Sequence, residues 1–267
     1  MQSIPLEFED FIKLDCDRKV FITTYLKERG VETAVISINQ KNHIYVKFPR
    51  KQYNPLYKIK TVIAHYDRVS NTFGANDNSA AVFCLMQAAV TLYKSYEAHN
   101  IRLIFTDGEE MGQNSINEQG SYDLALLFKK LNIINDDIFV FDCMGRGDIP
   151  LISKINFPKN ISSSFLAQYE NLEKKAEKLL SQSNSGRFCK IQSDYSDNIS
   201  FLVNGIAAVA ISLLPSNEIE DAKNGKKVQT WSYLHTPKDD LRTLWPKSFE
   251  ITKNIIFCLA KLRFILD

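Results

Sequence analysis

The sequence has little excess charge of either sign and little glycine or proline. It contains 33 basic and 31 acidic side chains, which gives a formal net charge of +2. A nucleic-acid-binding protein would concentrate excess Lys and Arg on one face, so we expect no nucleic-acid partner. Only 10 glycines and 8 prolines occur in 267 residues, which excludes a collagen-like or linker-dominated chain. A hydrophobic content of 45% also excludes wholesale disorder.

The sequence also lacks a membrane-spanning pattern and paired cysteines. Its first ten residues are acidic and contain no apolar signal-peptide region. The longest uncharged stretch, 198–217, is interrupted by polar residues, glycine and proline, so we interpret it as a core strand plus a loop and expect no membrane segment. The five cysteines show no CxxC spacing, and three lie in apolar segments typical of buried free thiols. A reducing, cytoplasmic location is therefore expected.

Strand-like and helix-like segments alternate along the chain, which predicts an α/β fold with a mostly parallel sheet. The expected strands are a hairpin at 35–48 with its turn at 39–42, followed by 60–65, 101–106, 138–142 and 206–214. The expected helices are 17–30, 79–93, 122–131, 162–180 and 247–264. No repeat of fixed period and no long flexible linker interrupts this pattern. We therefore predict a single domain over residues 1–267, with polar loops at 181–197 and 217–230.

Acidic and imidazole side chains stand where several of these apolar strands end. Ligands bind at the carboxyl ends of strands in open α/β sheets, so these groups are expected to meet in one crevice. The candidates are His65, Asp67, Glu109, Glu110 and Asp142 after strands, with Asp77 and His235 in loops.

A crevice with so many carboxylates requires compensating positive charge. Like charges raise each other's pKa, and desolvation costs several kcal/mol per ion. Divalent metal ions would compensate, and mixed imidazole and carboxylate ligands suit zinc, with cobalt or manganese as substitutes. Five ligands for two metals require one bridging carboxylate, as in two-metal hydrolases whose ions lie ~3.5–4 Å apart.

The adjacent pair Glu109 and Glu110 suggests a division of roles. Neighbouring side chains at a strand end point in different directions, so one carboxylate can bind metal while the other faces substrate. The second carboxylate suits a general base for metal-activated water. Asp67 follows His65 by two residues, and Asp239 follows His235 by four, so each could orient the imidazole of its histidine.

Each candidate also has an ordinary structural interpretation. Asp77 could cap the helix that follows it, and Asp142 could simply end a strand. Asp107–Glu110 could be a polar turn, and His235 could bond a loop carbonyl. All these interpretations must hold together for the site hypothesis to fail. The other two of the four histidines, His43 and His99, lie in segments typical of an ordinary surface.

Five ordered motifs resemble the cocatalytic zinc aminopeptidases of the bacterial leucyl aminopeptidase type, a family that also contains the glutaminyl cyclases. They are Ala64-His65-Tyr66-Asp67, Gly74-Ala75-Asn76-Asp77-Asn78, Asp107-Gly108-Glu109-Glu110, Phe141-Asp142-Cys143-Met144-Gly145 and His235-Thr236-Pro237-Lys238-Asp239. The resemblance spans about two-thirds of the chain. It implies a three-layer α/β/α sandwich around a mixed, twisted, eight-stranded sheet, as in zinc exopeptidases.

The resemblance also implies the role of each site residue. His65 and Asp142 would bind one zinc ion, Glu110 and His235 the other, and Asp77 would bridge both. Glu109 would be the general base in hydrolysis of the N-terminal residue of a peptide. The acidic centre would select a substrate with a free, cationic N-terminus.

Departures from the family pattern leave alternatives open. A longer insert, Met111–Gln119, precedes Gly120-Ser121 and favours the glutaminyl cyclases. Asn198 and Ser200 replace a usual His and Pro, and Ala207 replaces the proline of a usual Gly-Ile-Pro. A cyclase would use one zinc ion, held by Asp77, Glu110 and His235, with Glu109 as proton shuttle and Asp197 in an acidic network.

A third alternative is a catalytically silent relative on the same scaffold. The intact Glu109 argues against it, because a protein that only binds has no need of the base. The sequence leaves the oligomeric state, the side-chain preference and any role of the two loops as lids open.

Overall fold

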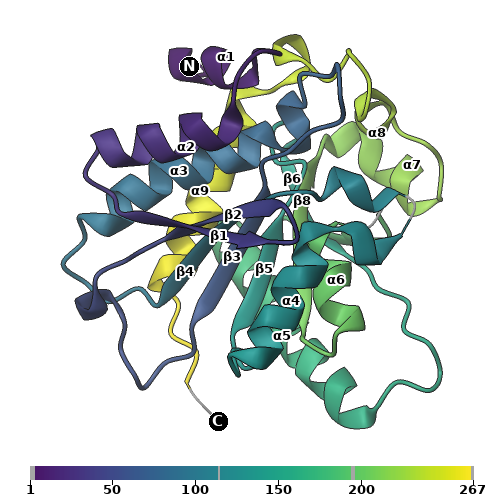
Figure 1. Cartoon of the computed structure of the whole chain (residues 1–267). Coiled ribbons are helices and arrows are strands. Elements are labelled where there is room, and N and C mark those ends of the chain that lie inside the picture. The colour runs from purple at the N-terminus through teal and green to yellow at the C-terminus, as the bar shows by residue number, and fades with distance from the viewer. Residues whose placement is uncertain (1–3, 114, 194–195, 266–267) are drawn as a thin grey trace.

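The computed structural model describes residues 4–113, 115–193 and 196–265. In these ranges eight strands form one sheet in the order β1-β2-β4-β3-β5-β8-β6-β7 (Figure 1). The strands are β1 (Thr33–Ile38), β2 (Lys41–Val46), β3 (Lys60–His65), β4 (Ile101–Thr106), β5 (Asp137–Phe141), β6 (Ile149–Ser153), β7 (Cys189–Ile191) and β8 (Ala208–Leu214). The helices are α1 (Leu6–Ile12), α2 (Arg18–Glu28), α3 (Ala80–Tyr93), α4 (Gly120–Lys130), α5 (Ser163–Ser183), α6 (Asp197–Val203), α7 (Ile219–Lys223), α8 (Gln229–Tyr233) and α9 (Pro246–Lys261).

The central strands β4, β3, β5 and β8 are parallel, whereas β1, β2 and β6 each pair antiparallel with a neighbour. The hairpin of β1 and β2 turns at Asn39 and Gln40, which both adopt positive φ. Two consecutive left-handed residues produce the tight turn whose twist matches the flanking strands. The prediction of a mixed, mostly parallel sheet with eight strands is confirmed.

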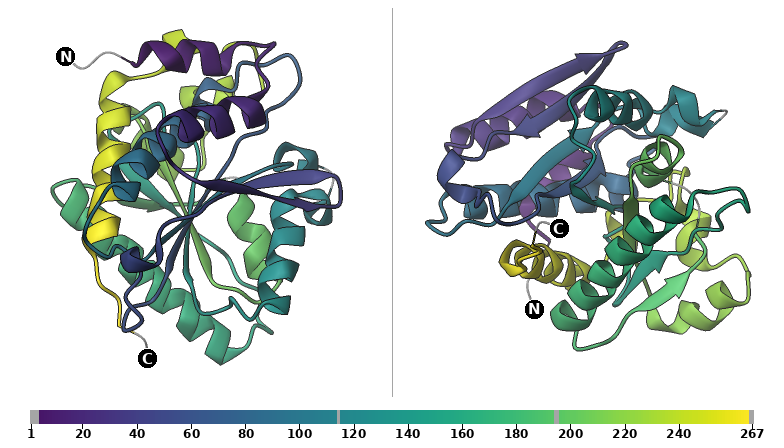
Figure 2. Two further views of the ribbon diagram at one scale, coloured as in Figure 1. Left: turned by 60° about the vertical axis from the view of Figure 1, so that its left-hand side comes forward. Right: turned by 90° about the horizontal axis from the view of Figure 1, so that it is seen from below.

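Alternate side chains of the central strands enter two different cores. On β5, Phe139 and Phe141 face the core formed with α2, α3, α5 and α9, while Ile138 and Val140 face the core formed with α4 and α6. Successive strand residues point to opposite faces, so a fully apolar strand requires cover on both sides. Figure 2 shows the sheet between these two helical layers, as the predicted α/β/α sandwich requires.

The predicted loops contain regular structure that the polar composition concealed. Residues 181–197 include the end of α5 and the short strand β7, which pairs parallel with β6. Residues 217–230 include α7 and the first turn of α8. Strand β7 and helices α7 and α8 are only three to five residues long, too short for sequence periodicity to reveal them.

The uncharged stretch 198–217 is a helix followed by a strand, so the prediction of a strand plus a loop was incomplete. Helix α6 begins at Asp197 and buries Asn198, Phe201 and Leu202. Polar residues at its start face the interior, which obscured its amphipathic pattern. No helix in the described ranges is long and apolar enough to cross a membrane. All five cysteines are free, but only Cys84 is fully buried.

The expected surface positions of His43 and His99 are wrong, because both rings are buried. His43 lies on β2, which the sheet encloses between β1 and β4. Its Nδ1 accepts a hydrogen bond from the amide of Asp107. His99 Nδ1 accepts from the amide of Ile101, and its Nε2 lies 3.1 Å from Gln52 Oε1. The burial of these two histidines therefore depends on the tertiary packing of the hairpin and of a loop, which local composition does not reveal.

Candidate metal centre

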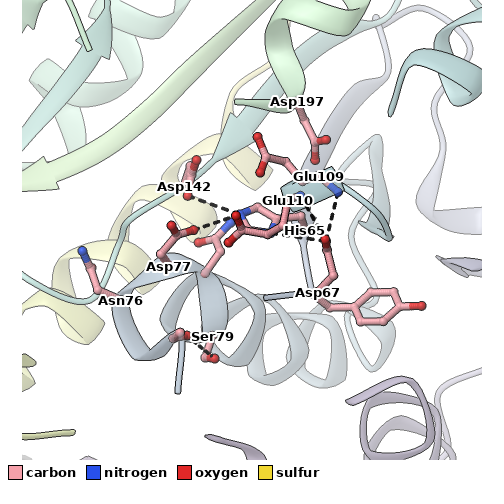
Figure 3. Close-up of polar contacts among 12 residues, drawn as sticks. His65, Asp67, Asn76, Asp77, Ser79, Glu109, Glu110, Asp142 and Asp197 are labelled. Carbon is pink, nitrogen blue, oxygen red and sulfur yellow. Dashed lines mark hydrogen bonds and ion pairs between the residues drawn. The ribbon is translucent and has the colours of Figure 1, made fainter. Parts of the chain in front are cut away.

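All seven site residues predicted from the sequence meet at one end of the sheet. His65 is the last residue of β3, the Glu109–Glu110 pair follows β4, and Asp142 follows β5. These strands are adjacent and parallel, so their carboxyl ends lie at one edge. Asp77 enters from the turn before α3, and His235 follows α8 (Figure 3 shows the part of this cluster around His65).

The first group of potential metal ligands contains His65, Asp77 and Asp142. His65 Nε2 lies 3.1 Å from Asp77 Oδ1 and 3.6 Å from Asp142 Oδ1. The imidazole is buried to 1% exposure. One nitrogen and two carboxylate oxygens therefore converge on a common point.

The second group contains Asp77, Glu110 and His235. His235 Nε2 lies 3.2 Å from both Asp77 Oδ2 and Glu110 Oε2. Asp77 thus presents Oδ1 to one histidine and Oδ2 to the other. This is the arrangement expected of a bridging carboxylate between two metal ions. A third, overlapping group joins His65 with Glu109 and Glu110.

Several of the converging nitrogen and oxygen atoms have no hydrogen-bond partner in the part of the chain that the structure describes. Both ring nitrogens of His65, together with Glu110 Oε2 and Asp142 Oδ1, are buried and have no hydrogen-bond partner among the described residues. Buried polar atoms without a partner are rare in folded proteins. A cation between them would satisfy these lone pairs, so the residues fit a divalent metal with nitrogen and oxygen ligands.

The pKa shifts of the site residues also indicate that this cluster of carboxylates requires positive charge. Burial, followed by the nearby charge of Asp77, raises the pKa of Glu110 to about 8. Asp77 also raises the pKa of His235 to about 9 through hydrogen bonding. Burial lowers the pKa of His65, but Asp142, Asp67 and Asp77 outweigh it and hold that pKa well above its usual range. Protons thus neutralise the centre when no metal does, and a divalent cation would displace them.

Glu109 lies beside the two ligand triads and belongs to the third group, with His65 and Glu110. Burial raises its pKa well above the ordinary value, and the nearby carboxylates of Asp197 and Asp142 act in the same direction. Its Oε1 accepts a 2.9 Å hydrogen bond from Gln119 Nε2. Asp197, at the start of α6, accepts a hydrogen bond from the hydroxyl of Thr106. Figure 3 shows Asp197 and Glu109 side by side, a proximity that only the cyclase alternative anticipated.

Asp67 lies beside His65, the ring that it is predicted to orient, and it also binds the backbone of the glutamate pair. Its Oδ1 lies 3.5 Å from His65 Nδ1. Its two oxygens accept hydrogen bonds from the backbone amides of Glu109 and Glu110. One half-buried carboxylate therefore links the loop after β3 to the loop after β4.

Asp239 does not orient His235, contrary to the sequence prediction. Its two oxygens accept from the backbone amides of Asn76 and Asp77, at 2.8 and 3.0 Å. The left-handed backbone of His235, with φ of 59°, begins a turn that carries Asp239 beneath the bridging residue. Asp239 therefore supports the metal centre through Asp77.

Asp77 does not cap helix α3 with its side chain. Its two neighbours anchor the turn instead. Asn78 Nδ2 donates to the carbonyl of Phe141, and Asn76 Oδ1 accepts from the amide of Gly145. The two asparagines thus tie the turn to the loop after β5, which also carries Asp142.

Arg18, at the start of α2, supports two ligand loops and was missed by the sequence analysis. Its guanidinium donates to the carbonyls of Tyr66, Asp67, Phe73 and Gly74 and to the hydroxyl of Ser79. A basic residue in the first turn of a helix gives no signal of such a role, because four of its partners are backbone carbonyls 48 to 56 residues away.

The three-layer fold and two ligand triads sharing a carboxylate define an α/β protein of the zinc-exopeptidase type. The chain belongs to peptidase family M28, whose family model matches residues 43–260. The five motifs fall inside that match. The N-terminal helices α1 and α2, which include Arg18, lie outside it. No curated protein matches this sequence.

Solved structures of two activities share the fold. A Bacteroides thetaiotaomicron glutaminyl cyclase bound to N-acetylhistamine has a TM-score of 0.69 at 14% identity, covering 95% of this chain and 94% of that one. The LapA aminopeptidase of Legionella pneumophila has a TM-score of 0.67 at 15% identity, covering 98% and 65%. A zinc aminopeptidase from Bacillus subtilis has a TM-score of 0.58 at 18% identity, covering 82% and 49%. This chain thus spans about half the length of the Bacillus enzyme.

Proposed function

We propose that this protein is a zinc-dependent aminopeptidase that hydrolyses the N-terminal residue of peptides with two zinc ions. The observation that carries the proposal is the pair of ligand triads that share Asp77, one with His65 and Asp142 and the other with Glu110 and His235. Asp77 turns one oxygen toward each histidine, which favours two metal ions over one. We extend the proposal to a cytoplasmic location.

When bound, the zinc ions would act as Lewis acids that polarise the peptide carbonyl and lower the pKa of water. Glu109 takes a proton from the attacking water and returns it to the leaving amine as the peptide bond breaks. Asp67 holds Glu109 at its backbone amide, and so fixes where that proton is exchanged. The products are a free amino acid and a peptide shortened by one residue.

A cavity of about 410 Å³ opens beside the metal centre and suits the first residue of a peptide. Glu109, Glu110 and Asp142 line this cavity together with the apolar side chains of Trp231 and Ile199. The acidic lining favours a cationic α-ammonium group, which supports selection of a free N-terminus. Serine hydroxyls also contribute to the wall, at Ser153, Ser193, Ser196 and Ser212.

Glutaminyl cyclase activity is the second candidate, because of the insert before α4 and because solved cyclases share this fold. In this reaction the α-amine of an N-terminal glutamine attacks its own side-chain amide and releases ammonia. Glu109 would shuttle the proton, and Asp77, Glu110 and His235 would hold one zinc ion.

Metal stoichiometry and two assays on the same preparation separate the candidates. Protein purified without chelator is expected to hold two zinc equivalents and to hydrolyse aminoacyl-anilides. One zinc equivalent with cyclisation of a glutaminyl peptide would favour the cyclase. Absence of both activities in zinc-loaded protein would identify a silent relative.

The Glu109→Gln variant tests the role of the base directly. We expect it to keep the wild-type zinc content and lose turnover by roughly 10²- to 10⁴-fold, because the amide cannot accept the proton. Glu110→Gln is the matched control, since it alters the neighbouring ligand and should lower the zinc content. Retention of most activity in Glu109→Gln would refute the assigned mechanism.

A further inference from the structure

Two residues that interrupt the family pattern meet at the general base. Gln119 ends the insert before α4, and its side chain donates a 2.9 Å hydrogen bond from Nε2 to Glu109 Oε1. Ser200 on α6 stands where the family has proline, and its hydroxyl bonds Gln119 Oε1 at 2.7 Å. Gln119 and Ser200 are 5% and 0% exposed. They are 81 residues apart in sequence, so only the fold brings them together.

The chemistry of these groups fixes the direction of the chain. Glu109 accepts a proton as general base in its ionised form, which only accepts hydrogen bonds, so the NH₂ group of Gln119 faces it. The amide oxygen that faces Ser200 also only accepts, so the hydroxyl must donate. Proline at position 200 would have no donor, and the amide of residue 119 would lose its orientation. The serine and the glutamine are therefore complementary.

We propose that Gln119, oriented by Ser200, is a positioning residue that holds the carboxylate of Glu109 for proton transfer. The inference rests on the proposed function of Glu109 as base or proton shuttle. Asp67 fixes the backbone of Glu109 through its amide, and Gln119 fixes the far end of the side chain. With Oε1 occupied by the amide, Oε2 is the oxygen left to exchange the proton.

The test uses Gln119→Met, which keeps a similar length and removes the amide. In the zinc-loaded protein we expect kcat to fall roughly 10- to 100-fold, the cost typical of a misplaced catalytic group, with KM changed by less than about threefold. Zinc content should equal that of the wild type. Asn117→Leu is the matched control, because Asn117 is an exposed amide of the same insert, and wild-type kcat is expected.

The Ser200→Ala variant tests whether the serine acts through Gln119. Alone it should lower kcat less than Gln119→Met does, and it should add nothing in the double variant, because coupled residues are not additive. Additive losses would overturn the proposed chain, as would a wild-type kcat in Gln119→Met. A higher KM with unchanged kcat would assign Gln119 to substrate binding and overturn its positioning role.

Crystal structures of the wild type and Gln119→Met give a readout that does not need turnover. One Glu109 conformation in the wild type and a displaced or split side chain in Gln119→Met would support the proposal. An unmoved Glu109 would overturn it. If the wild type neither hydrolyses nor cyclises its substrates, the proposed function fails, while this comparison still decides the positioning role.

Discussion

The four histidines of this protein form two pairs with opposite electrostatic surroundings. His65 and His235 face carboxylates of the metal centre, which raise the pKa of both imidazoles. His43 and His99 lie in the core, where burial lowers the pKa of each to about 4. His65 and His43 are equally buried, at 1% and 0% exposure. Burial alone therefore does not decide the charge of a histidine, and the charge of its neighbours does.

The largest expected difference between the pairs is in zinc binding. His65→Gln should bind one zinc equivalent fewer and lose roughly 10³-fold in turnover, because one triad loses its only imidazole. His99→Gln is the matched control from the core pair, and its zinc content and turnover at 25 °C should equal those of the wild type. Elemental analysis and an anilide assay measure both, and two zinc equivalents in His65→Gln would remove that residue from the ligand set.

A smaller effect is expected one layer behind the ligands. Asp239→Asn leaves one oxygen to accept from the amides of Asn76 and Asp77, and places an NH₂ group against the other. Zinc affinity should fall roughly 10- to 100-fold, the usual cost of altering a group that supports a ligand. Asp240→Asn is the control, because that side chain bonds the amide of Arg242 instead. Equal zinc affinity in the two variants would contradict the role of Asp239.

Removal of zinc should make the site sensitive to alkaline pH. The pKa of Glu110 in the metal-free fold, about 8, lies above the ordinary value, so the folded state binds more protons than the unfolded state between pH 4.5 and 8. The free energy of unfolding therefore falls as pH rises through this window. Between pH 6.5 and 8, chelated wild type should lose roughly 1–2 kcal/mol more than chelated Glu110→Gln in urea unfolding. Parallel pH profiles would contradict this prediction.

The core pair should respond in the opposite direction. The pKa of His99, about 4, lies below the ordinary 6.5. Between these two pH values the imidazole is protonated in the unfolded state and neutral in the folded state. Stability is complete above pH 6.5 and falls as pH drops toward 4. Between pH 6.5 and 5 we expect a loss of up to about 2 kcal/mol from this residue. His99→Gln should lack that loss in urea unfolding, and an unchanged acid slope would show that His99 is already charged in the fold.

The sequence was most informative where chemistry and strand ends coincide. His65, Glu109, Glu110 and Asp142 follow apolar strands, and parallel pairing brings such positions together without further information. Asp77 and His235 lie in loops, where they were candidates with no strand end to place them, and the family resemblance implied their roles.

Contacts between segments far apart in the chain could not be predicted from the sequence. Arg18 donates chiefly to backbone carbonyls, which every residue possesses, so no side-chain pattern marks its partners. Asp239 bonds backbone amides for the same reason. His43 and His99 were misplaced because hairpin docking and loop packing bury them, and neither is encoded in local composition. The link from Ser200 through Gln119 to Glu109 consists of two departures that have meaning only when the fold joins them.

The guanidinium of Arg18 makes the metal centre depend on a part of the chain outside the family match. Through this one side chain, helix α2 is hydrogen-bonded to both the segment after His65 and the turn before Asp77. Detachment of α2 would free both segments together, since they share the same donor. Their amide protons should therefore exchange with solvent as one cooperative unit, at a rate set by the undocking of α2. The time for which these two segments stay ordered is therefore set by how long α2 remains docked.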